Sequence, residues 1–492
     1  MSLTVDEIVR RNALTLPDRV AVTMEGVALT YRELDTLADQ MAHALRAKGL
    51  GYQERVISWS ENNLLLLPLF LATAKLGAVF APINARLSAN EASKLLQLAD
   101  PALIIADGPH FEMGSDIAQR AGLPILTLDE TPSDLSLPML ARASSTEPVK
   151  EPRLTELDAQ VLFFTSGSTG QPKGVVLSHR TNFLRGWQGQ YIDEPLRMVC
   201  MFPLFHMGGF TLALQAWQTQ GEITFVRSPV AKSLLDEVQA RRANHLYCIP
   251  AVWSRILAED LSTWDLSSLK IADTGTSATP PELIQALKTQ FPASLVRVFY
   301  GSTEAGFVAG LFDVDVLRKP GSVGRPGVGV EVKLTDAGEI CVRTHAMFDG
   351  YFRNPDATRQ AIRGGWYHTG DRGAFDDEGY LYVTGRLKEI IRSGGETISP
   401  VEVESALADH PALREIAVIG IPDAKWGEIV CAVAVLCEGA TLTLEALRIH
   451  VEGKLASYKA PRRLEFVDAI PRTAATNQVQ RALLIERLQL RR

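Results

Sequence analysis

The sequence contains few cysteines, and none of them stands in a Cys-x-x-Cys pair. Five thiols in 492 residues have neither the even count nor the close spacing of a disulfide framework or a zinc site. We therefore expect a reducing compartment, no disulfide and no zinc centre, with each thiol a small buried apolar group. The five are Cys200, Cys248, Cys341, Cys431 and Cys437.

A long hydrophobic run is also missing. The most apolar stretch, residues 64–74, contains Pro68 and is followed by Lys75, well short of the roughly 20 apolar residues that cross a bilayer. The first thirteen residues are charged and lack the apolar core of a secretory signal. We therefore expect a cytoplasmic protein without a membrane span.

Basic residues are not in excess. The 50 Lys and Arg residues against 57 Asp and Glu residues give a net charge of -7, so the chain offers no electrostatic attraction for nucleic acid. The composition, 46% hydrophobic and 22% charged, is that of an ordinary globular protein. Because 492 residues exceed what a single core usually holds, two or more domains are expected.

Apolar segments that favour strands alternate with helical segments over the first 300 residues. Because the strand segments are continuously apolar, they predict parallel sheets that helices cover on both faces. Strands are expected at 55–59, 78–83, 102–106, 246–250, 269–273 and 295–300, with helices at 64–76 and 90–99 among them.

From Gly321 onward, alternating strands with glycine turns predict a small antiparallel β-barrel. Residues 385–388 are the strongest candidate for a domain boundary, since the sequence after them has an α+β pattern of its own. The predicted fold class is α/β, with two parallel α/β subdomains and the barrel in an N-terminal domain (1–385). A hinge (386–388) connects it to a small α+β C-terminal domain (389–492).

The most informative segment is TSGSTGQPKG at residues 165–174, directly after an apolar strand that ends at Phe164. Glycines allow backbone N–H groups to converge on an anion, the hydroxyl groups add donors, and Lys173 adds a positive charge. The segment is not a Walker A loop, because the order GxxxxGK[ST] is not satisfied. It predicts a phosphate-binding loop.

This decapeptide resembles the signature of the adenylate-forming superfamily, which comprises acyl-CoA synthetases, peptide-synthetase adenylation domains and firefly luciferase. The resemblance covers essentially the whole chain, because further family motifs follow in the right order. These motifs are FPLFHMGG at 202–209, YGSTE at 300–304, WYHTGD at 366–371 and GRLK at 385–388. The resemblance implies that the ligands are ATP or acyl-AMP, CoA and, where ATP is used, Mg²⁺.

The resemblance also implies roles for individual residues. Tyr300 would stack on adenine, Thr303 would contact the α-phosphate, Glu304 would bind Mg²⁺, Asp371 would bind the ribose hydroxyls, and Arg386 would pair with ribose or phosphate. The implied nucleotide site is Thr165, Ser166, Gly167, Ser168, Thr169, Gly170, Lys173, Ser277, Ala278, Phe299, Tyr300, Gly301, Ser302, Thr303, Asp371, Val383 and Arg386. The implied catalytic set is Thr165, Lys173, His206, Glu304 and Arg386.

For the acyl group, the resemblance implies that His206 gates the pocket by packing its ring rather than by acting as a general base. The implied acyl pocket is His206, Met207, Gly208, Gly275, Thr276 and Gly301. The implied CoA loop is Ser393, Gly394, Gly395 and Glu396, and the implied hinge pivot is Lys388.

The chain departs from the family pattern near its C-terminus. In the family, a lysine on a mobile C-terminal loop contacts the carboxylate and the α-phosphate during adenylation only. CoA then attacks the acyl-AMP after the C-terminal domain has rotated. The aligned loop here, 471–481, has one additional residue and places Gln478 where the lysine is expected. An amide does not neutralise charge on the phosphate, so we expect adenylation to be weak, although Arg472 or Arg481 could substitute.

A second departure is Gly275-Thr276-Ser277-Ala278, which replaces the family's usual Gly-Gly-Ala-Pro. Thr276 puts a β-branched side chain where the close approach of backbone to ligand favours glycine. It is expected to reshape the junction between acyl group and adenylate. Drift explains the change equally well.

Four hypotheses follow from these residues. The leading one is a CoA ligase that makes acyl-CoA from acyl-AMP supplied by a separate adenylating protein. Its acid would be a bulky or aryl carboxylic acid of a specialised biosynthetic pathway such as natural-product biosynthesis. The alternatives are a complete ATP-dependent acyl-CoA synthetase and a non-catalytic acyl-AMP binding protein, with a peptide-synthetase adenylation role as a further possibility. The chain is expected to be a monomer or a homodimer.

Overall fold

The computed structural model describes residues 3–131, 133–166, 172–187, 194–387, 389–393, 396–423, 426–452, 454–474 and 476–489. The chain divides into two compact units. The large unit consists of Met1–Pro320, Gly327–Glu331 and Arg343–Tyr367, and the small unit of Gly321–Pro326, Val332–Val342 and His368–Arg492. The predicted boundary at 385–388 stays a prediction.

One sheet of the large unit carries the predicted phosphate loop. Its strand order is β18-β8-β7-β4-β3-β5-β6, in which β4, β3, β5 and β6 are parallel, β7 pairs in parallel with β4, and β8 runs antiparallel to β7. The strands are β3 (Arg55–Trp59), β4 (Val79–Ile83), β5 (Leu103–Ala106), β6 (Ile125–Thr127), β7 (Ala159–Ser166), β8 (Pro172–Ser178) and β18 (Gly350–Tyr351). The helices between them are α3 (Leu66–Leu76), α4 (Ala89–Ala99), α5 (Gly108–Ala121) and α6 (Leu137–Arg142).

A second sheet of the large unit has the order β14-β13-β12-β11-β9-β10-β1-β2. The strands are β1 (Val20–Met24), β2 (Val27–Thr30), β9 (Arg197–Cys200), β10 (Glu222–Phe225), β11 (His245–Tyr247), β12 (Ile271–Gly275), β13 (Leu295–Ser302) and β14 (Gly306–Leu311). The helices are α1 (Asp6–Thr15), α2 (Tyr31–Ala47), α7 (His179–Gly186), α8 (Met207–Gln218), α9 (Ala231–Ala240), α10 (Pro250–Leu257) and α11 (Pro281–Gln290), with a 3₁₀ turn at Leu261–Thr263.

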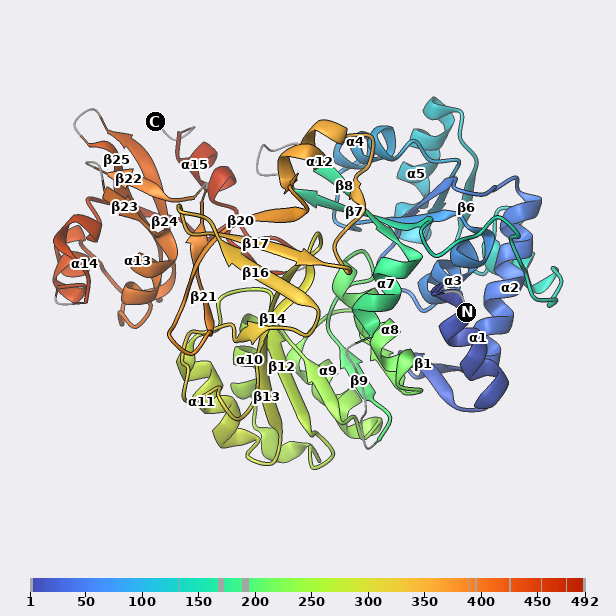
Figure 1. The fold of residues 1–492 in the computed structure, drawn as a ribbon, viewed down its shortest axis with the longest axis horizontal. Helices are drawn as coiled ribbons and strands as arrows, with labels where there is room; N and C mark the ends of the chain where they lie inside the picture. Colours follow the sequence, from blue (N-terminus) through green and yellow to red (C-terminus); the bar gives the residue numbers. More distant parts are fainter. Residues whose placement is uncertain are drawn as a thin grey trace. The chain divides into compact units, whose positions relative to one another are not determined.

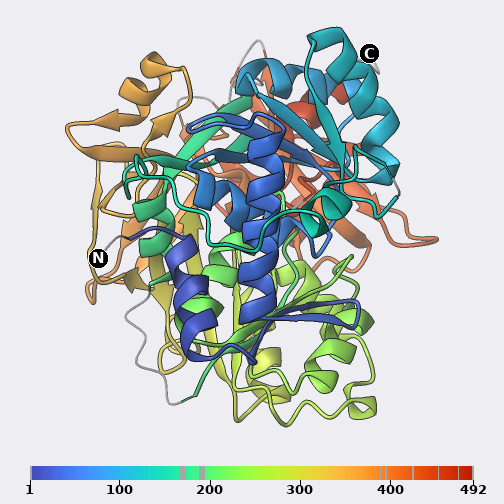
Figure 2. The same ribbon diagram turned by 90° about the vertical axis from the view of Figure 1, so that its right-hand side faces the viewer.

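Helices α1 and α2 lie side by side, with α2 the long helix in Figure 2. Helix α2 begins with a capping box in which Thr30 accepts from the backbone N–H of Glu33 and Glu33 accepts from that of Thr30. The remaining elements of the large unit are α12 (Pro355–Ala361) and β19 (Ile362–Arg363), which pairs with the start of β20.

In the small unit, the segment predicted to be a barrel forms a sheet with the order β16-β17-β20, with β21 on β20. These strands are β16 (Val330–Leu334), β17 (Glu339–Thr344), β20 (Trp366–Phe375) and β21 (Leu381–Arg386), and a short strand β15 is at Arg325–Pro326.

The C-terminal part has the order β23-β22-β25-β24, with β26 parallel to β25. Helices α13 and α14 pack on one face of this sheet and α15 packs on the other, as Figure 1 shows for the orange and red elements. The elements are β22 (Ile391–Ser393), β23 (Glu396–Ile398), α13 (Pro400–Leu407), β24 (Leu413–Asp423), β25 (Gly427–Leu436), α14 (Leu444–His450), a 3₁₀ turn (Ser457–Lys459), β26 (Arg463–Phe466) and α15 (Arg481–Gln489).

The predicted fold class is confirmed. All five cysteines lie within the described residues and none is in a disulfide. Four are buried, while Cys437 is only partly buried, contrary to expectation. Across the described ranges, no helix has the length and apolar character needed to span a membrane.

Candidate active site

The predicted phosphate loop connects two antiparallel strands of the large unit. Thr165 at the end of β7 lies opposite Lys173 on β8, and Ser166 lies opposite Pro172. Both Thr165 and Lys173 are half-buried. Register therefore brings the predicted hydroxyl and ammonium groups to the same end of the hairpin. The predicted ligands Gly167, Ser168, Thr169 and Gly170 lie outside the described residues.

Lys173 and Glu304 both contact Tyr351, a residue on β18 that the sequence motifs did not indicate. The Lys173 Nζ lies 4.6 Å from the centre of the Tyr351 ring. The Tyr351 hydroxyl donates to Glu304 Oε1 over 3.0 Å. A carboxylate oxygen is the ligand type that Mg²⁺ prefers, so Glu304 fits the metal role that the sequence implies.

The turn that carries Thr303 and Glu304 joins β13 to β14 and is held by its backbone. Arg185 Nη1 donates to the Thr303 carbonyl over 2.9 Å, and its Nη2 donates to the Glu304 carbonyl over 3.1 Å. The Phe348 N–H also donates to the Glu304 carbonyl, over 2.7 Å. The Ser302 hydroxyl accepts from the Ala305 N–H. These bonds fix the direction in which the two predicted phosphate and metal ligands leave the turn.

Arg185 was not predicted from the sequence. Its side chain is buried in helix α7, and its Nε donates to the Ala346 carbonyl over 2.9 Å. Burial lowers the pKa of Arg185 to about 10, so the guanidinium remains charged at neutral pH. The buried polar residues His179, Asn182 and Arg185 recur every third position of α7. This polar stripe is visible in the sequence of α7, but it does not show what Arg185 contacts.

The predicted acyl-pocket residues His206 and Met207 are at the start of helix α8. His206 caps the helix, because its Nδ1 accepts from the Gly208 N–H over 3.0 Å. The proton of the neutral ring is therefore on Nε2. Burial lowers the pKa of His206 to about 4, so the ring is neutral near pH 7. The ring stacks on Phe202, with centroids 5.6 Å apart and an interplanar angle of 16°.

Further aromatic rings extend this packing. Phe202 meets Tyr247 edge-on at 5.3 Å, and Tyr247 lies 6.2 Å from Phe299. Phe299 on β13 pairs with Gly275 at the end of β12. A Cβ at Gly275 would come within 2.2 Å of the Phe299 carbonyl oxygen and 2.9 Å of the Tyr247 hydroxyl, so only glycine fits there. Tyr300 and Gly301, both predicted ligands, follow Phe299 on β13.

Thr276 adopts a backbone conformation that is rare for its residue type. Its φ of +63° is in the left-handed region, where a β-branched residue is an outlier. Its hydroxyl donates to the Gly275 carbonyl over 2.6 Å. The backbone conformation is therefore a reason why a glycine suits this position. Ser277 and Ala278 follow on the turn to α11.

In the small unit, Asp371 and Arg386 lie opposite each other on β20 and β21. Arg386 Nε is 2.7 Å from Asp371 Oδ1, and the Asp371 side chain is only 9% exposed. Asp371 donates its N–H to the Thr369 hydroxyl. Val383 is on the same strand as Arg386 and is half-buried. The two predicted ribose ligands thus lie next to each other and form an ion pair.

Glu339 supports the turn before Asp371. It accepts from the Gly370 N–H over 3.1 Å, and its other oxygen lies 2.7 Å from Nδ1 of His368. Glu339, Cys341 and His368 offer ligand atoms within 4.8 Å of one another, which is close enough for a metal ion. Because Glu339 and His368 bond to each other and to the turn, we interpret the group as support for Asp371.

The predicted CoA loop begins at Ser393, which is buried at the end of β22 and pairs with Glu396 on β23. Gly394 and Gly395, and the predicted hinge pivot Lys388, lie outside the described residues.

The loop at the missing lysine is a tight turn. The Thr473 N–H donates to the Gln478 carbonyl over 2.8 Å, and the Gln478 N–H donates to the Thr473 hydroxyl over 2.9 Å. Asn477 has a φ of +56°, the left-handed conformation that favours glycine and that asparagine tolerates. Asn477 thus has the backbone expected at the glycine of a Thr-Gly-Lys turn. The Gln478 side chain that follows is exposed.

Both arginines near this loop are engaged within the small unit. Arg481 Nη1 is 2.7 Å from Glu389, its Nη2 is 2.6 Å from Glu404, and its Nε donates to the Val418 carbonyl. Arg472 Nη2 is 3.1 Å from Glu415, and its Nη1 donates to the Asn477 carbonyl over 3.0 Å.

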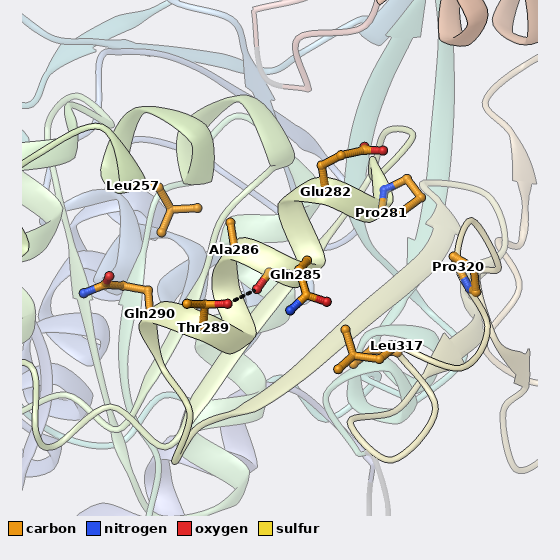
Figure 3. Close-up of a pocket in the computed structure, with 10 residues that line it drawn as sticks. Leu257, Pro281, Glu282, Gln285, Ala286, Thr289, Gln290, Leu317 and Pro320 are labelled. Atoms are coloured by element: carbon orange, nitrogen blue, oxygen red, sulfur yellow. Dashed lines mark hydrogen bonds between the residues drawn. The ribbon is translucent and has the colours of Figure 1, made fainter. Parts of the chain in front are cut away.

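A surface pocket of about 720 Å³ lies elsewhere on the large unit, between α11 and the loop that ends at Pro320 (Figure 3). Of the residues that line it, Glu282 is the one with an ionisable side chain, and no predicted site residue is among them. It therefore has no place in the candidate site.

Comparisons with known proteins agree with this arrangement. Residues 9–352 match the model of the AMP-binding enzyme family, and residues 402–476 match that of the AMP-binding enzyme C-terminal domain. The chain is 32% identical to an indoleacetate–CoA ligase of Aromatoleum aromaticum, over 96% of each chain. It is 30% identical to a long-chain-fatty-acid–CoA ligase of Mycobacterium tuberculosis, over 97% of each chain. ATP-bound MatB from Rhodopseudomonas palustris has a similar structure, with a TM-score of 0.91, 28% identity and 99% of both chains covered.

Proposed function

Because the chain belongs to the family of AMP-binding enzymes, within the adenylate-forming superfamily of CoA ligases, we propose that it forms acyl-CoA from acyl-AMP and CoA. We propose further that its ATP-dependent adenylation half-reaction is weak or absent. The acyl-AMP would then be supplied by a separate adenylating protein.

The observation that carries the proposal is the neutral, exposed side chain of Gln478 at the position where the family carries a lysine. The left-handed Asn477 before it supports the alignment despite the additional residue in the loop. An amide donates a hydrogen bond but brings no positive charge to the α-phosphate. Removing one such donor from a site of developing charge typically reduces the rate about 10²- to 10³-fold, and losing a cation costs at least as much.

Arg481 is poorly placed to replace the lysine. Its side chain is only 11% exposed, and it pairs with Glu404, which is 17% exposed. Burial raises the pKa of Glu404, an effect that the charge of Arg481 opposes. Moving the guanidinium toward a phosphate would leave this carboxylate without its main partner, which typically costs about 3–5 kcal/mol.

Arg472 is the more credible substitute, and it supports the second candidate function, a complete ATP-dependent acyl-CoA synthetase. Its ion pair with Glu415 is more exposed, at 29% and 34% for the two side chains, so the pair is easier to break. Its bond to the Asn477 carbonyl places it directly beside Gln478. A third candidate, a non-catalytic acyl-AMP binding protein, is disfavoured by the retention of Lys173 and Glu304.

Thioester formation requires less positive charge from the protein than adenylation does. The CoA sulfur bonds to the acyl carbon, the bond from that carbon to the phosphate oxygen breaks, and AMP leaves with the electron pair. The thiol proton passes to solvent. AMP is a good leaving group already bound by the nucleotide residues, so no additional ammonium group from the C-terminal loop is required. Mg²⁺ would be needed only where ATP is used.

For the acid, we propose an aryl or other bulky carboxylate. Around the buried Phe202, the half-buried rings of His206, Tyr247 and Phe299 offer faces and edges on which a flat aromatic acid packs well. The similarity to an indoleacetate–CoA ligase is consistent with such a substrate. The similarity to a long-chain-fatty-acid–CoA ligase favours an aliphatic acid instead. A role in a specialised biosynthetic pathway remains part of the proposal.

Two parallel assays test the proposal. The purified chain receives ATP, Mg²⁺, CoA and a panel of aryl and fatty acids in one, and synthetic acyl-AMP with CoA in the other. Acyl-CoA in the second assay without pyrophosphate in the first is the expected result. Pyrophosphate released at an ordinary synthetase rate would establish the complete synthetase instead. No product in either assay would favour a binding protein.

A further inference from the structure

Tyr351 lies between the two oppositely charged groups of the phosphate site. Its ring is under the Lys173 ammonium group, at 4.6 Å, and its hydroxyl donates to Glu304 Oε1, at 3.0 Å. Among the described residues, Lys173 makes no ion pair, although a carboxylate is bound to the far end of the same ring. A direct pair between Lys173 and Glu304 would occupy both groups and keep them from a ligand.

The ring is held rigidly. Tyr351 is only 8% exposed and pairs with Val175 on β8, the strand that also carries Lys173. Its N–H donates to the Thr358 hydroxyl, and Phe348 packs on its ring with centroids 4.9 Å apart. Burial and the charge of Glu304 raise the pKa of the Tyr351 hydroxyl, so it stays protonated and remains a donor.

We propose that Tyr351 is a positioning residue that keeps Lys173 and Glu304 apart and holds each in the orientation needed for a nucleotide. The ring face holds the ammonium group by a cation–π interaction. The hydroxyl fixes one oxygen of Glu304, and the carboxylate would then be oriented to hold Mg²⁺. The inference rests on the nucleotide role of Lys173 and Glu304 in the proposed function, but not on whether adenylation occurs.

Two substitutions separate the two contacts. Tyr351→Phe keeps the ring and removes the bond to Glu304, whereas Tyr351→Leu removes both contacts. Phe348→Leu is the matched control, because it disturbs the same aromatic packing without removing either contact. Binding of ATP to the full chain is measured by calorimetry with excess EDTA and again over a series of Mg²⁺ concentrations. The melting temperature of each variant is recorded.

For Tyr351→Phe we expect the Mg²⁺ concentration for half-maximal enhancement of ATP binding to rise about 10-fold, the loss typical of one hydrogen bond to a charged group. Its metal-free ATP affinity should stay within about twofold, because the cation–π contact is kept. For Tyr351→Leu the metal-free affinity should also fall, by about fivefold to tenfold. The Phe348→Leu variant keeps both contacts and only loosens the packing of the ring, so it should change each quantity by less than the Tyr351 substitutions do, whatever its melting temperature.

An unchanged Mg²⁺ dependence in Tyr351→Phe would overturn the inference. So would equal effects of all three substitutions in proportion to their melting temperatures, since that is the result of a merely structural role. Should Tyr351→Leu fail to fold, the Phe variant alone decides. If the wild-type chain binds no ATP with or without Mg²⁺, the positioning role is overturned. The proposed function is judged separately, because formation of acyl-CoA from synthetic acyl-AMP and CoA requires neither ATP nor Mg²⁺.

Discussion

Replacing Gln478 by lysine tests the central claim most directly. The backbone of Gln478 is bonded to Thr473 through both its N–H and its carbonyl, and the side chain is exposed. The substitution therefore leaves the turn intact, and we expect the free energy of unfolding to change by less than about 0.5 kcal/mol. What it adds is a positive charge at the place where the family uses one.

The expected gain follows from the value of a donor aimed at developing charge, about 2.7–4 kcal/mol. Acid-dependent pyrophosphate release from ATP should therefore rise about 10²- to 10³-fold in Gln478→Lys. The step from acyl-AMP and CoA to acyl-CoA should stay within about threefold, because the lysine takes no part in it. The two steps thus respond differently to one change.

The assay is single-turnover pyrophosphate release, with thioester formation from synthetic acyl-AMP measured in parallel. Gln478→Met is the control for side-chain length without charge, and it should behave like the wild type. Arg472→Ala should leave any residual pyrophosphate release unchanged. If Arg472→Ala abolishes a substantial wild-type rate, or if lysine brings no gain even in combination with Thr276→Gly, the reasoning about Gln478 is refuted.

Three further predictions concern the rest of the site. Thr276→Gly should raise the free energy of unfolding in denaturant by about 1 kcal/mol, because it removes a β-branched residue from the left-handed conformation. It should also change which acyl-AMP is used fastest. A loss of stability would argue against strain at this turn. Arg185→Met should weaken ATP binding in calorimetry at least about 10-fold, because the carbonyls of Thr303 and Glu304 lose their donor, whereas binding equal to wild type would show that the turn holds itself. Burial lowers the pKa of His179 to about 3, below its value near 6.5 in the unfolded chain. Below pH 6.5 the unfolded chain therefore takes up a proton at His179 that the folded chain does not, and the folded state loses stability as the pH falls. From pH 7 to pH 5, the free energy of unfolding measured in denaturant should fall by about 2 kcal/mol because of this residue. The fall should be smaller in His179→Asn.

The strands with continuous apolar sequence were predictable because their burial on both faces leaves a clear signal. The predicted strand at 55–59 agrees with β3 at both ends, and the predicted strand at 78–83 differs from β4 by one residue. The sequence did not predict which strands lie next to each other in the sheets. Strand β1 pairs with β10, two hundred positions later in the chain, and nothing local in either segment specifies that contact.

The same distinction applies to the site. Residues such as Lys173, Glu304 and Asp371 could be proposed as ligands from the sequence because each lies in a short motif. Arg185 and Tyr351 could not, because their importance comes from contacts with residues far away in the sequence. Thr276 is intermediate: the sequence raised the question of a missing glycine, and the φ angle supplied a physical reason.

The distribution of charge connects these observations. In the small unit, Arg386 pairs with Asp371, Arg472 with Glu415, and Arg481 with glutamates. In the large unit, a ring face holds Lys173 and neutral carbonyls hold Arg185, and neither forms an ion pair with any residue that the structure describes. The single phosphate of acyl-AMP carries one negative charge, so binding it demands less positive charge than binding ATP does. Adenylation brings a carboxylate beside the triphosphate of ATP. We propose that the neutral Gln478 leaves part of this negative charge unscreened, and this is why we expect adenylation to be the weak half-reaction.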